Sequence, residues 1–115
     1  IAPGMKISLE SLARHTAQLP WIDLETPPPG AVGKTTVDSM KSGLLLGTAC
    51  LVEGMTKRME EELGEDVSLI LTGTFAPLIA PLCRRECRTE PDLILRGLRL
   101  IYERHREKRG DKPAK

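Results

Sequence analysis

Residues 35–64, TTVDSMKSGLLLGTACLVEGMTKRMEEELG, decide the fold of this chain. Apolar residues recur at helical spacing along the whole stretch: Val37, Met40, Leu44, Leu51, Met55, Met59 and Leu63. The hydroxyl of Thr35 or Thr36 suits the cap of a first turn, and Gly64 is a suitable stop signal. We therefore expect one long central helix that ends near Gly64.

Small residues form a second, narrow line along the same predicted helix: Gly43, Gly47, Cys50 and Gly54. Each glycine inside a helix costs about 0.5–1 kcal/mol relative to alanine. Three of them indicate that another helix or strand approaches closely. The helix is therefore expected to be buried on more than one side, with a second copy of the chain as one candidate neighbour.

The flanking residues predict alternating helices and strands. The expected elements are a helix over 5–18 that stops before Pro20, a short edge strand over 21–24, an extended proline-rich loop over 25–33, a buried strand over 67–71, a short helix over 75–82 broken by Pro77 and Pro81, and a last helix from Pro91 whose Leu95, Leu98, Ile101 and Tyr102 face inward. This alternation indicates α/β packing with a small sheet.

The composition narrows the functional classes. A chain of 115 residues suits one compact domain or half of a two-lobed protein. The sequence starts within an apolar segment and has no initiator Met, which favours a part of a longer chain. The net charge of +1 gives no global reason to expect nucleic acid as a partner. No apolar run approaches the ~20 residues of a membrane span. Three cysteines, an odd number, favour a reducing cytoplasm over a secreted disulfide framework.

Residues 30–35, GAVGKT, superficially match a phosphate-binding P-loop. That motif needs four residues between its glycines, whereas two separate Gly30 from Gly33 here. Three consecutive prolines also precede it, and they lack the N–H groups that bind phosphate. We interpret the segment as a loop that leads into a Thr-capped helix, and a P-loop NTPase fragment is a poor alternative.

The remaining chemically distinctive residues predict no metal site and no catalytic group. Cys83 and Cys87 flank Arg84-Arg85-Glu86, but structural zinc needs four ligands and no second cysteine pair exists. We interpret both as incidental thiols. The acidic residues Glu10, Glu53 and Asp92 lie in predicted helices, where such side chains are usually solvated or paired, and none is assigned a catalytic role.

A set of short phrases points to a family. They are Ile1-Ala2-Pro3-Gly4, Thr16-Ala17-Gln18-Leu19-Pro20, Gly33-Lys34-Thr35-Thr36, Met40-Lys41-Ser42-Gly43, Val52-Glu53-Gly54, Thr72-Gly73, Pro91-Asp92-Leu93, and residues 97–104, GLRLIYER. In this order they resemble the C-terminal half of type III pantothenate kinases. The resemblance implies the C-terminal lobe of an actin-like, acetate-and-sugar-kinase-like (ribonuclease H-like) α/β fold over residues 1–104. A basic, disordered tail is expected over residues 105–115.

The resemblance implies a function for the intact protein. Such kinases transfer the γ-phosphate of ATP to pantothenate in the first step of coenzyme A biosynthesis. They use Mg²⁺ and a monovalent cation (K⁺ or NH₄⁺) and work as cytoplasmic homodimers. The family's Asp-Gly-Asn-Thr phosphate loop, catalytic aspartate and second phosphate motif do not occur in this sequence. No catalytic residue is therefore expected here, and this piece alone is expected to be inactive.

Three positions match the family's ligand-binding motifs. Thr36 matches the threonine that binds pantothenate, although a role as helix cap alone is the competing interpretation. Thr72 and Gly73 match a Thr-Gly-Gly turn beside the adenosine of ATP. Thr74 replaces the usual second glycine, and its Cβ narrows the approach to the backbone. Together with the cysteine pair, Thr74 keeps open an alternative: a catalytically degenerate relative that acts as a dimerisation or accessory protein.

Overall fold

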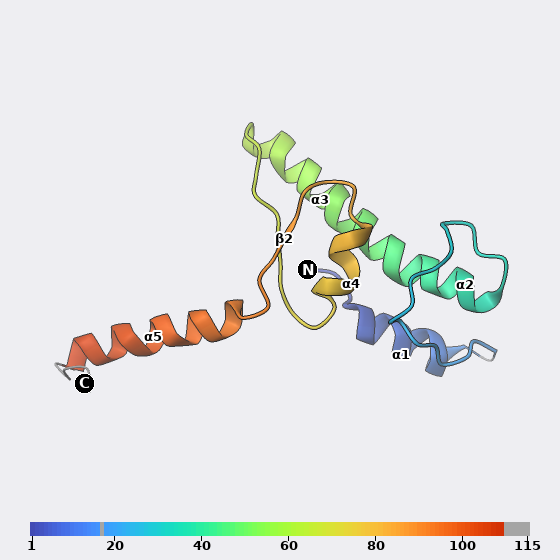
Figure 1. Cartoon of the computed structure of the whole chain (residues 1–115), viewed down its shortest axis with the longest axis horizontal. Coiled ribbons are helices and arrows are strands. Elements are labelled where there is room, and N and C mark those ends of the chain that lie inside the picture. The colour runs from blue at the N-terminus through green and yellow to red at the C-terminus, as the bar shows by residue number, and fades with distance from the viewer. Residues whose placement is uncertain (17, 110–115) are drawn as a thin grey trace.

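The computed structural model describes residues 1–16 and 18–109 (Figure 1). The elements, in chain order, are α1 (Met5–His15), α2 (Thr36–Lys41), the π-helical turn η1 (Ser42–Leu46), α3 (Gly47–Leu63), β1 (Ile70–Leu71), α4 (Ala76–Ile79), the 3₁₀ turn η2 (Ala80–Leu82), β2 (Arg88–Thr89) and α5 (Leu93–Arg109). β1 and β2 form a parallel pair in which Ile70 lies opposite Arg88. The chain is thus a helix-rich α/β domain with a small sheet. None of the described helices has the length and apolar character that crossing a membrane requires.

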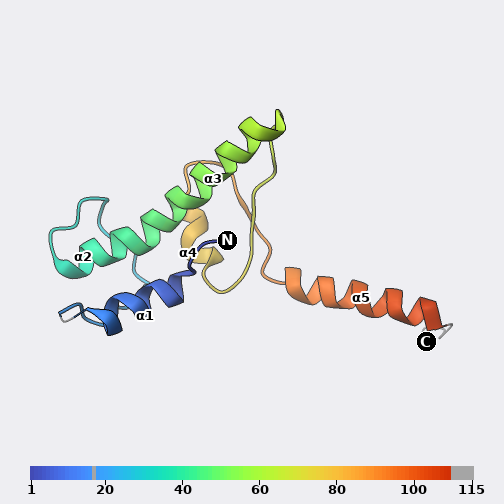
Figure 2. The same cartoon turned by 180° about the vertical axis from the view of Figure 1, so that it is seen from behind.

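The long helix is the longest continuous feature of the structure. α2, η1 and α3 follow one another without a break from Thr36 to Leu63 (Figures 1 and 2). In η1 the N–H of Gly47 reaches back to the carbonyl of Ser42, which is the wider spacing of a π-helical turn. Gly64 ends the helix with φ of 73°, a left-handed conformation that glycine adopts at little cost. The predicted helix and its stop signal are confirmed.

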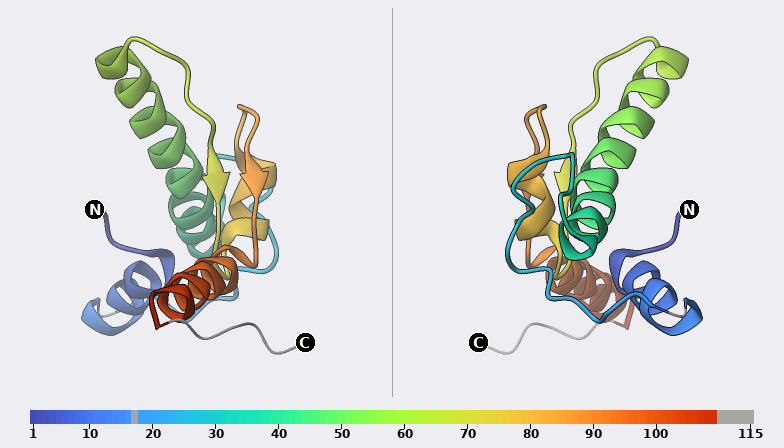
Figure 3. Two further views of the ribbon diagram at one scale, coloured as in Figure 1. Left: turned by 90° about the vertical axis from the view of Figure 1, so that its left-hand side faces the viewer. Right: turned by 90° about the vertical axis from the view of Figure 1, so that its right-hand side faces the viewer.

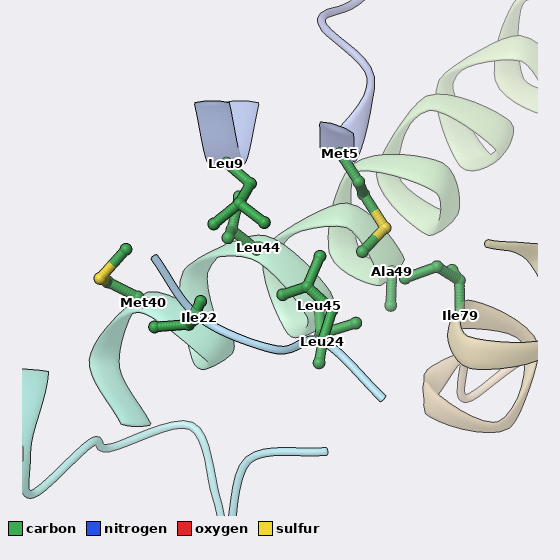
Figure 4. Close-up of a cluster of buried hydrophobic side chains, with 9 residues drawn as sticks. All are labelled: Met5, Leu9, Ile22, Leu24, Met40, Leu44, Leu45, Ala49 and Ile79. Atoms are coloured by element: carbon green, nitrogen blue, oxygen red, sulfur yellow. The ribbon is translucent and has the colours of Figure 1, made fainter. Parts of the chain in front are cut away.

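The hydrophobic core surrounds the first half of the long helix. Its members are Met5, Leu9, Ile22, Leu24, Met40, Leu44, Leu45, Ala49 and Ile79 (Figure 4). Leu45 is the most enclosed large side chain among the described residues, with 1% of its surface exposed. Helix α1 covers one side of this half, and residues 22–24 and α4 cover the other. The core therefore joins four segments that are far apart in sequence.

The second half of the long helix differs from the prediction. Its apolar stripe, Leu51, Met55, Met59 and Leu63, is 45–61% exposed. A Cβ built on Gly43, Gly47 or Gly54 meets no atom within 4 Å. The close neighbour that these glycines predict is therefore not supplied by any described part of this chain.

The last helix also differs from the prediction. Leu95, Leu98, Ile101 and Tyr102 were expected to face inward, but they are 58–67% exposed. The physical reason is the direction of α5, which leaves β2 and extends away from the body (Figures 1 and 2). The helix continues to Arg109, so the first residues of the predicted tail, 105–109, are helical. The rest of that tail, 110–115, lies outside the described residues.

The predicted strands are shorter than expected. Residues 21–24 alternate in burial as a strand would, with Ile22 and Leu24 buried and Trp21 exposed, but they form no ladder with a neighbouring strand. Within residues 67–71, ladder pairing is confined to Ile70 and Leu71. The helix predicted over 5–18 ends at His15, and the last helix begins at Leu93 rather than Pro91. The broken short helix near Pro77 and Pro81 is present as α4 and η2.

Two carboxylates of α3 hold the loop between η2 and β2 against the helix. Glu53 accepts hydrogen bonds from the backbone N–H groups of Arg84 and Arg85, the latter at 3.1 Å. Glu60 accepts both arms of the Arg85 guanidinium, at 2.7 and 3.0 Å, and also the N–H of Val67. Forked pairs of this kind fix geometry as well as charge. The hydrogen bonds from Arg85 and Val67 lower the pKa of Glu60 from 4.5 to about 2.

This ion pair predicts a specific loss of stability in acid. Because the folded chain keeps Glu60 ionised down to about pH 2, whereas the unfolded chain protonates it near pH 4.5, lowering the pH favours unfolding. The stabilisation is fully present above about pH 5 and disappears as the pH falls towards 2. The melting temperature of the wild type should therefore exceed that of Glu60→Gln at neutral pH, and the difference should shrink across this window.

Glu61→Gln is the matched control, because the Glu61 carboxylate makes no hydrogen bond or ion pair with any described residue. It should change the unfolding free energy at pH 7 by no more than about 0.5 kcal/mol. A constant difference between wild type and Glu60→Gln from pH 7 to pH 2 would contradict the role given to the ion pair.

Candidate functional site

The first turn of α2 separates the roles of two adjacent threonines. Thr35 is the N-cap, and its hydroxyl accepts the N–H of Asp38 at 3.1 Å. Thr36 is the first helical residue, and no described residue forms a hydrogen bond with its hydroxyl. The interpretation of Thr36 as a cap is therefore wrong, because the neighbouring residue fills that role. The Thr36 hydroxyl is free to meet a ligand.

Thr36 lies in the wall of a cavity of about 640 Å³ between α1 and the long helix. The lining residues are Pro3, Ser8, Leu12, Leu19, Thr36, Ser39, Met40, Gly43, Leu44, Gly47, Thr48 and Leu51. Among the lining residues Ser8, Thr36, Ser39 and Thr48 carry hydroxyl groups, most of the others are apolar, and none carries a charge. Such a surface suits a small ligand that combines an aliphatic part with hydroxyl or amide groups.

The two glycines in the lining keep this cavity open. Gly43 and Gly47 face open space, because a Cβ on either would meet nothing within 4 Å. The sequence pattern predicts close packing at these positions, and the described chain instead shows room for a ligand or another chain. The nearby Thr48 hydroxyl is already used, because it donates to the carbonyl of Leu44.

The proline-rich loop before α2 is anchored to the helix that it precedes. The hydroxyl of Ser42 donates to the carbonyl of Ala31 at 2.7 Å, and the ammonium group of Lys41 donates to the carbonyl of Thr26 at 3.1 Å. A Cβ on Gly33 would approach the backbone nitrogen of Ser39 more closely than real atoms do. Contact with the first turn of α2, rather than phosphate binding, thus accounts for Gly33.

The Thr72-Gly73 turn follows directly on β1. Gly73 has φ of 93°, which favours glycine, and its carbonyl accepts the N–H of Ala76 at 3.1 Å. Since the described residues with positive φ are all glycines, Thr74 adopts an ordinary backbone conformation. Thr74 lines a second cleft of about 800 Å³ between this turn and residues 21–25, with Trp21 and Lys6 among the other lining residues.

The structure does not bring the predicted site residues into one cavity. Ser8 and Leu12 of α1 line the first cavity, whereas Lys6 and Leu9 line the second. Thr36 lines the first cavity and Thr74 the second, and Thr72 and Gly73 line neither of them.

Among the residues that line these cavities, sequence reasoning did not single out Ser8, Ser39 or Trp21. The sequence could have indicated Ser39, because it follows Thr36 by three positions and so lies on the same face of a helix. Nothing in the sequence connects Ser8 with Thr36, because Ser8 comes from a different helix.

The acidic residues and cysteines form no metal centre among the described residues. Glu53 belongs to the contacts that hold the η2–β2 loop, which is a structural role. The carboxylates of Glu10 and Asp92 pair with no described cation. Within residues 1–16 and 18–109, no three His, Cys, Asp or Glu side chains are placed to hold a metal ion.

Comparison with known proteins identifies the family of this helix-rich α/β domain. The family model described as type III pantothenate kinase matches residues 1–58. The enzyme named type III pantothenate kinase from Rhodococcus jostii (strain RHA1) is 46% identical over 114 residues, which cover 96% of this chain and 42% of that protein. The corresponding enzyme from Thermus thermophilus is 49% identical over 102 residues, covering 89% of this chain and 40% of its own length.

A more distant relative of the same name, from Rubrobacter xylanophilus, is 38% identical over 107 residues. The chain belongs to the type III pantothenate kinase family, and the predicted resemblance is confirmed. It spans about two fifths of the length of the relatives that it matches.

The contact between Gly33 and α2 predicts unequal effects of two glycine substitutions. Gly33→Ala should destabilise the chain by about 1–3 kcal/mol, because its methyl group collides with the backbone of Ser39. Gly30→Ala is the matched control, since its Cβ meets nothing within 4 Å. Urea unfolding followed by circular dichroism measures both. Equal effects would show that the loop does not pack on α2 as described.

Proposed function

We propose that this chain provides the pantothenate-binding side of a type III pantothenate kinase, which transfers the γ-phosphate of ATP to pantothenate as the first step of coenzyme A biosynthesis. Family membership supports the reaction class. One observation carries the assignment of the site: Thr35 caps the helix, and the adjacent Thr36, whose hydroxyl bonds to no described residue, lines a cavity.

The lining of the Thr36 cavity suits part of pantothenate. The ligand has a branched aliphatic segment, hydroxyls, an amide and a carboxylate. Leu12 and Leu44 offer apolar contacts, and Ser8, Thr36 and Ser39 offer hydroxyls. Because the lining holds no cation, the carboxylate would be met by groups outside this lining.

The phosphate chemistry would come from the part of the relatives that this chain does not span. Phosphoryl transfer needs charge stabilisation and a group that orients the attacking hydroxyl. Mg²⁺ and a monovalent cation (K⁺ or NH₄⁺) would supply charge neutralisation when bound. The described residues offer no acidic cluster that fits either ion, so no step is assigned to them here. We accordingly place no catalytic residue in this chain, and expect it to be inactive alone.

The Thr72-Gly73 turn is proposed to lie on the adenosine side of the nucleotide site. Support comes from its position after a parallel strand, where α/β folds commonly bind ligands. The positive φ of Gly73 directs the chain away from β1 at this point and leaves backbone accessible. Thr74, in an ordinary conformation, borders the adjacent cleft.

Residues 1–104 are proposed to form the C-terminal lobe of an actin-like fold in a cytoplasmic homodimer, with 105–115 as its basic tail. The large exposed surface area supports the view that other protein segments normally pack against this lobe. The chain exposes 9246 Å², whereas a compact monomer of its mass exposes about 6200 Å². Its radius of gyration of 18.9 Å likewise exceeds the roughly 13 Å of a compact chain of this length. A second lobe and a second copy would cover the apolar sides of α3 and α5.

The alternative of a catalytically degenerate accessory protein gains no support. The relatives compared above all carry the name of the kinase. Thr74, which had suggested degeneracy, does not adopt the strained conformation that its Cβ would oppose.

Binding of pantothenate to the 115-residue chain tests the role of Thr36. Isothermal titration should show that Thr36→Ala binds pantothenate about 2- to 12-fold more weakly than wild type, because one hydrogen bond contributes about 0.5–1.5 kcal/mol. Thr36→Ser keeps the hydroxyl and should restore most of the affinity. Thr48→Ala is a control from the same cavity, since that hydroxyl is bonded to Leu44. Equal affinities for wild type and Thr36→Ala would rule out the assignment.

A chimera tests the reaction itself. The part of the Thermus thermophilus relative that precedes the matched region is fused to this chain, and ATP-dependent formation of phosphorylated pantothenate is measured. We expect turnover in the chimera, none in this chain alone, and a lower rate in the chimera with Thr36→Ala. A folded chimera that binds ATP and pantothenate without turnover would contradict the proposed function.

A further inference from the structure

The loop between η2 and β2 carries two half-buried cysteines, Cys83 and Cys87, that the proposed function leaves unused. Figures 1 and 3 show this loop leaving the short helices, turning and returning to β2. The chain bends at Arg84 and Arg85, between the two cysteines. Cys83 and Cys87 therefore stand on opposite limbs of one turn.

A shared acceptor brings the two ends of this loop together. The thiol of Cys87 lies 3.6 Å from the carbonyl oxygen of Ala80, and the backbone N–H of Cys83 donates to the same oxygen at 3.3 Å. The Cys87 thiol and the backbone of Cys83 thus meet at one carbonyl oxygen. Because only three residues separate the two cysteines, closing a disulfide bond of about 2.05 Å requires a rearrangement of residues 83–87.

The protein fixes the turn between the two thiols. Glu53 accepts the N–H groups of both Arg84 and Arg85, and Glu60 holds the Arg85 guanidinium. A turn held in this way keeps two reacting groups at high effective concentration. A disulfide would leave no orphaned carbonyl, because Ala80 keeps the N–H of Cys83.

We propose that Cys83 and Cys87 form a reversible intramolecular disulfide when the protein meets a peroxide. Hydrogen peroxide converts one thiol to a sulfenic acid and is reduced to water. The second thiol then attacks the sulfenic sulfur, the S–S bond forms, and a second water leaves. The two sulfurs together lose two electrons and the peroxide gains them. A dithiol reductant reverses the reaction.

The surroundings of Cys83 set the rate of this reaction. Burial, followed by the neighbouring Cys87 thiol and by Glu53 and Cys50, raises the pKa of Cys83 from 9.0 to about 11. Because the thiolate is the reactive form, Cys83 reacts slowly near neutral pH. Cys50, exposed on α3, is the weakest of these influences.

Peptide mapping of the oxidised chain tests the proposal. The 115-residue protein is treated with hydrogen peroxide, alkylated and digested with trypsin without reduction. Because trypsin cleaves after Arg84 and Arg85, the three cysteines fall on three separate peptides. We expect residues 59–84 linked to residues 86–88, loss of alkylation at Cys83 and Cys87, and recovery of both after dithiothreitol. Cys50→Ser should keep this link, and Cys83→Ser or Cys87→Ser should abolish it.

The variant Glu53→Ala tests whether the folded turn, and not only the short sequence separation of the two cysteines, promotes the disulfide. This variant keeps all three cysteines but loses the carboxylate that holds the turn, so the link should form several-fold more slowly. An unchanged rate in Glu53→Ala, a link that includes Cys50, or oxidation of the thiols to sulfinic acid without any link would each overturn the proposal.

Discussion

Burial of the first half of the long helix around Leu45 holds together segments that are far apart in sequence. Helix α1, residues 22–24 and α4 each place apolar side chains against this one surface (Figure 4). Enclosing a leucine contributes about 1.5–3 kcal/mol, so a few such residues supply much of the stability of a small domain. The cavity beside Thr36 and the cleft beside Thr74 are both bordered by elements that this core positions.

Beyond the end of this core, polar contacts hold the neighbouring loop against the long helix. Beyond Ala49 the apolar stripe of the long helix is largely exposed, and the described neighbour of the helix is the η2–β2 loop. Glu53 and Glu60 bind that loop through two backbone amides and one guanidinium. The same contacts hold the turn that lies between Cys83 and Cys87. One arrangement thus fixes the path of the chain into β2.

Two large apolar surfaces remain without a neighbour in the described chain. They are the outer side of α3 and the length of α5. Glycines along the first surface would allow another backbone to approach closely, since nothing in the described chain occupies that space. An isolated domain rarely keeps such surfaces exposed, which agrees with a chain that spans about two fifths of its relatives.

The sequence by itself determined the features that depend on neighbouring residues. A threonine cap and Gly64 mark the ends of the long helix because capping and left-handed termination are local effects. The order of the short sequence motifs also indicated the family. Local pattern failed for Leu98 and Ile101, because helical periodicity shows which residues share a face but not whether anything covers it.

Tertiary structure decided how these pieces meet. The sequence left Thr35 and Thr36 equivalent as caps, and the hydrogen bond to Asp38 assigns the cap to Thr35. Ser8 joins Thr36 across helices, and Glu53 reaches amides more than thirty residues away. Such contacts depend on the path of the whole chain through space, and no single stretch of sequence records that path.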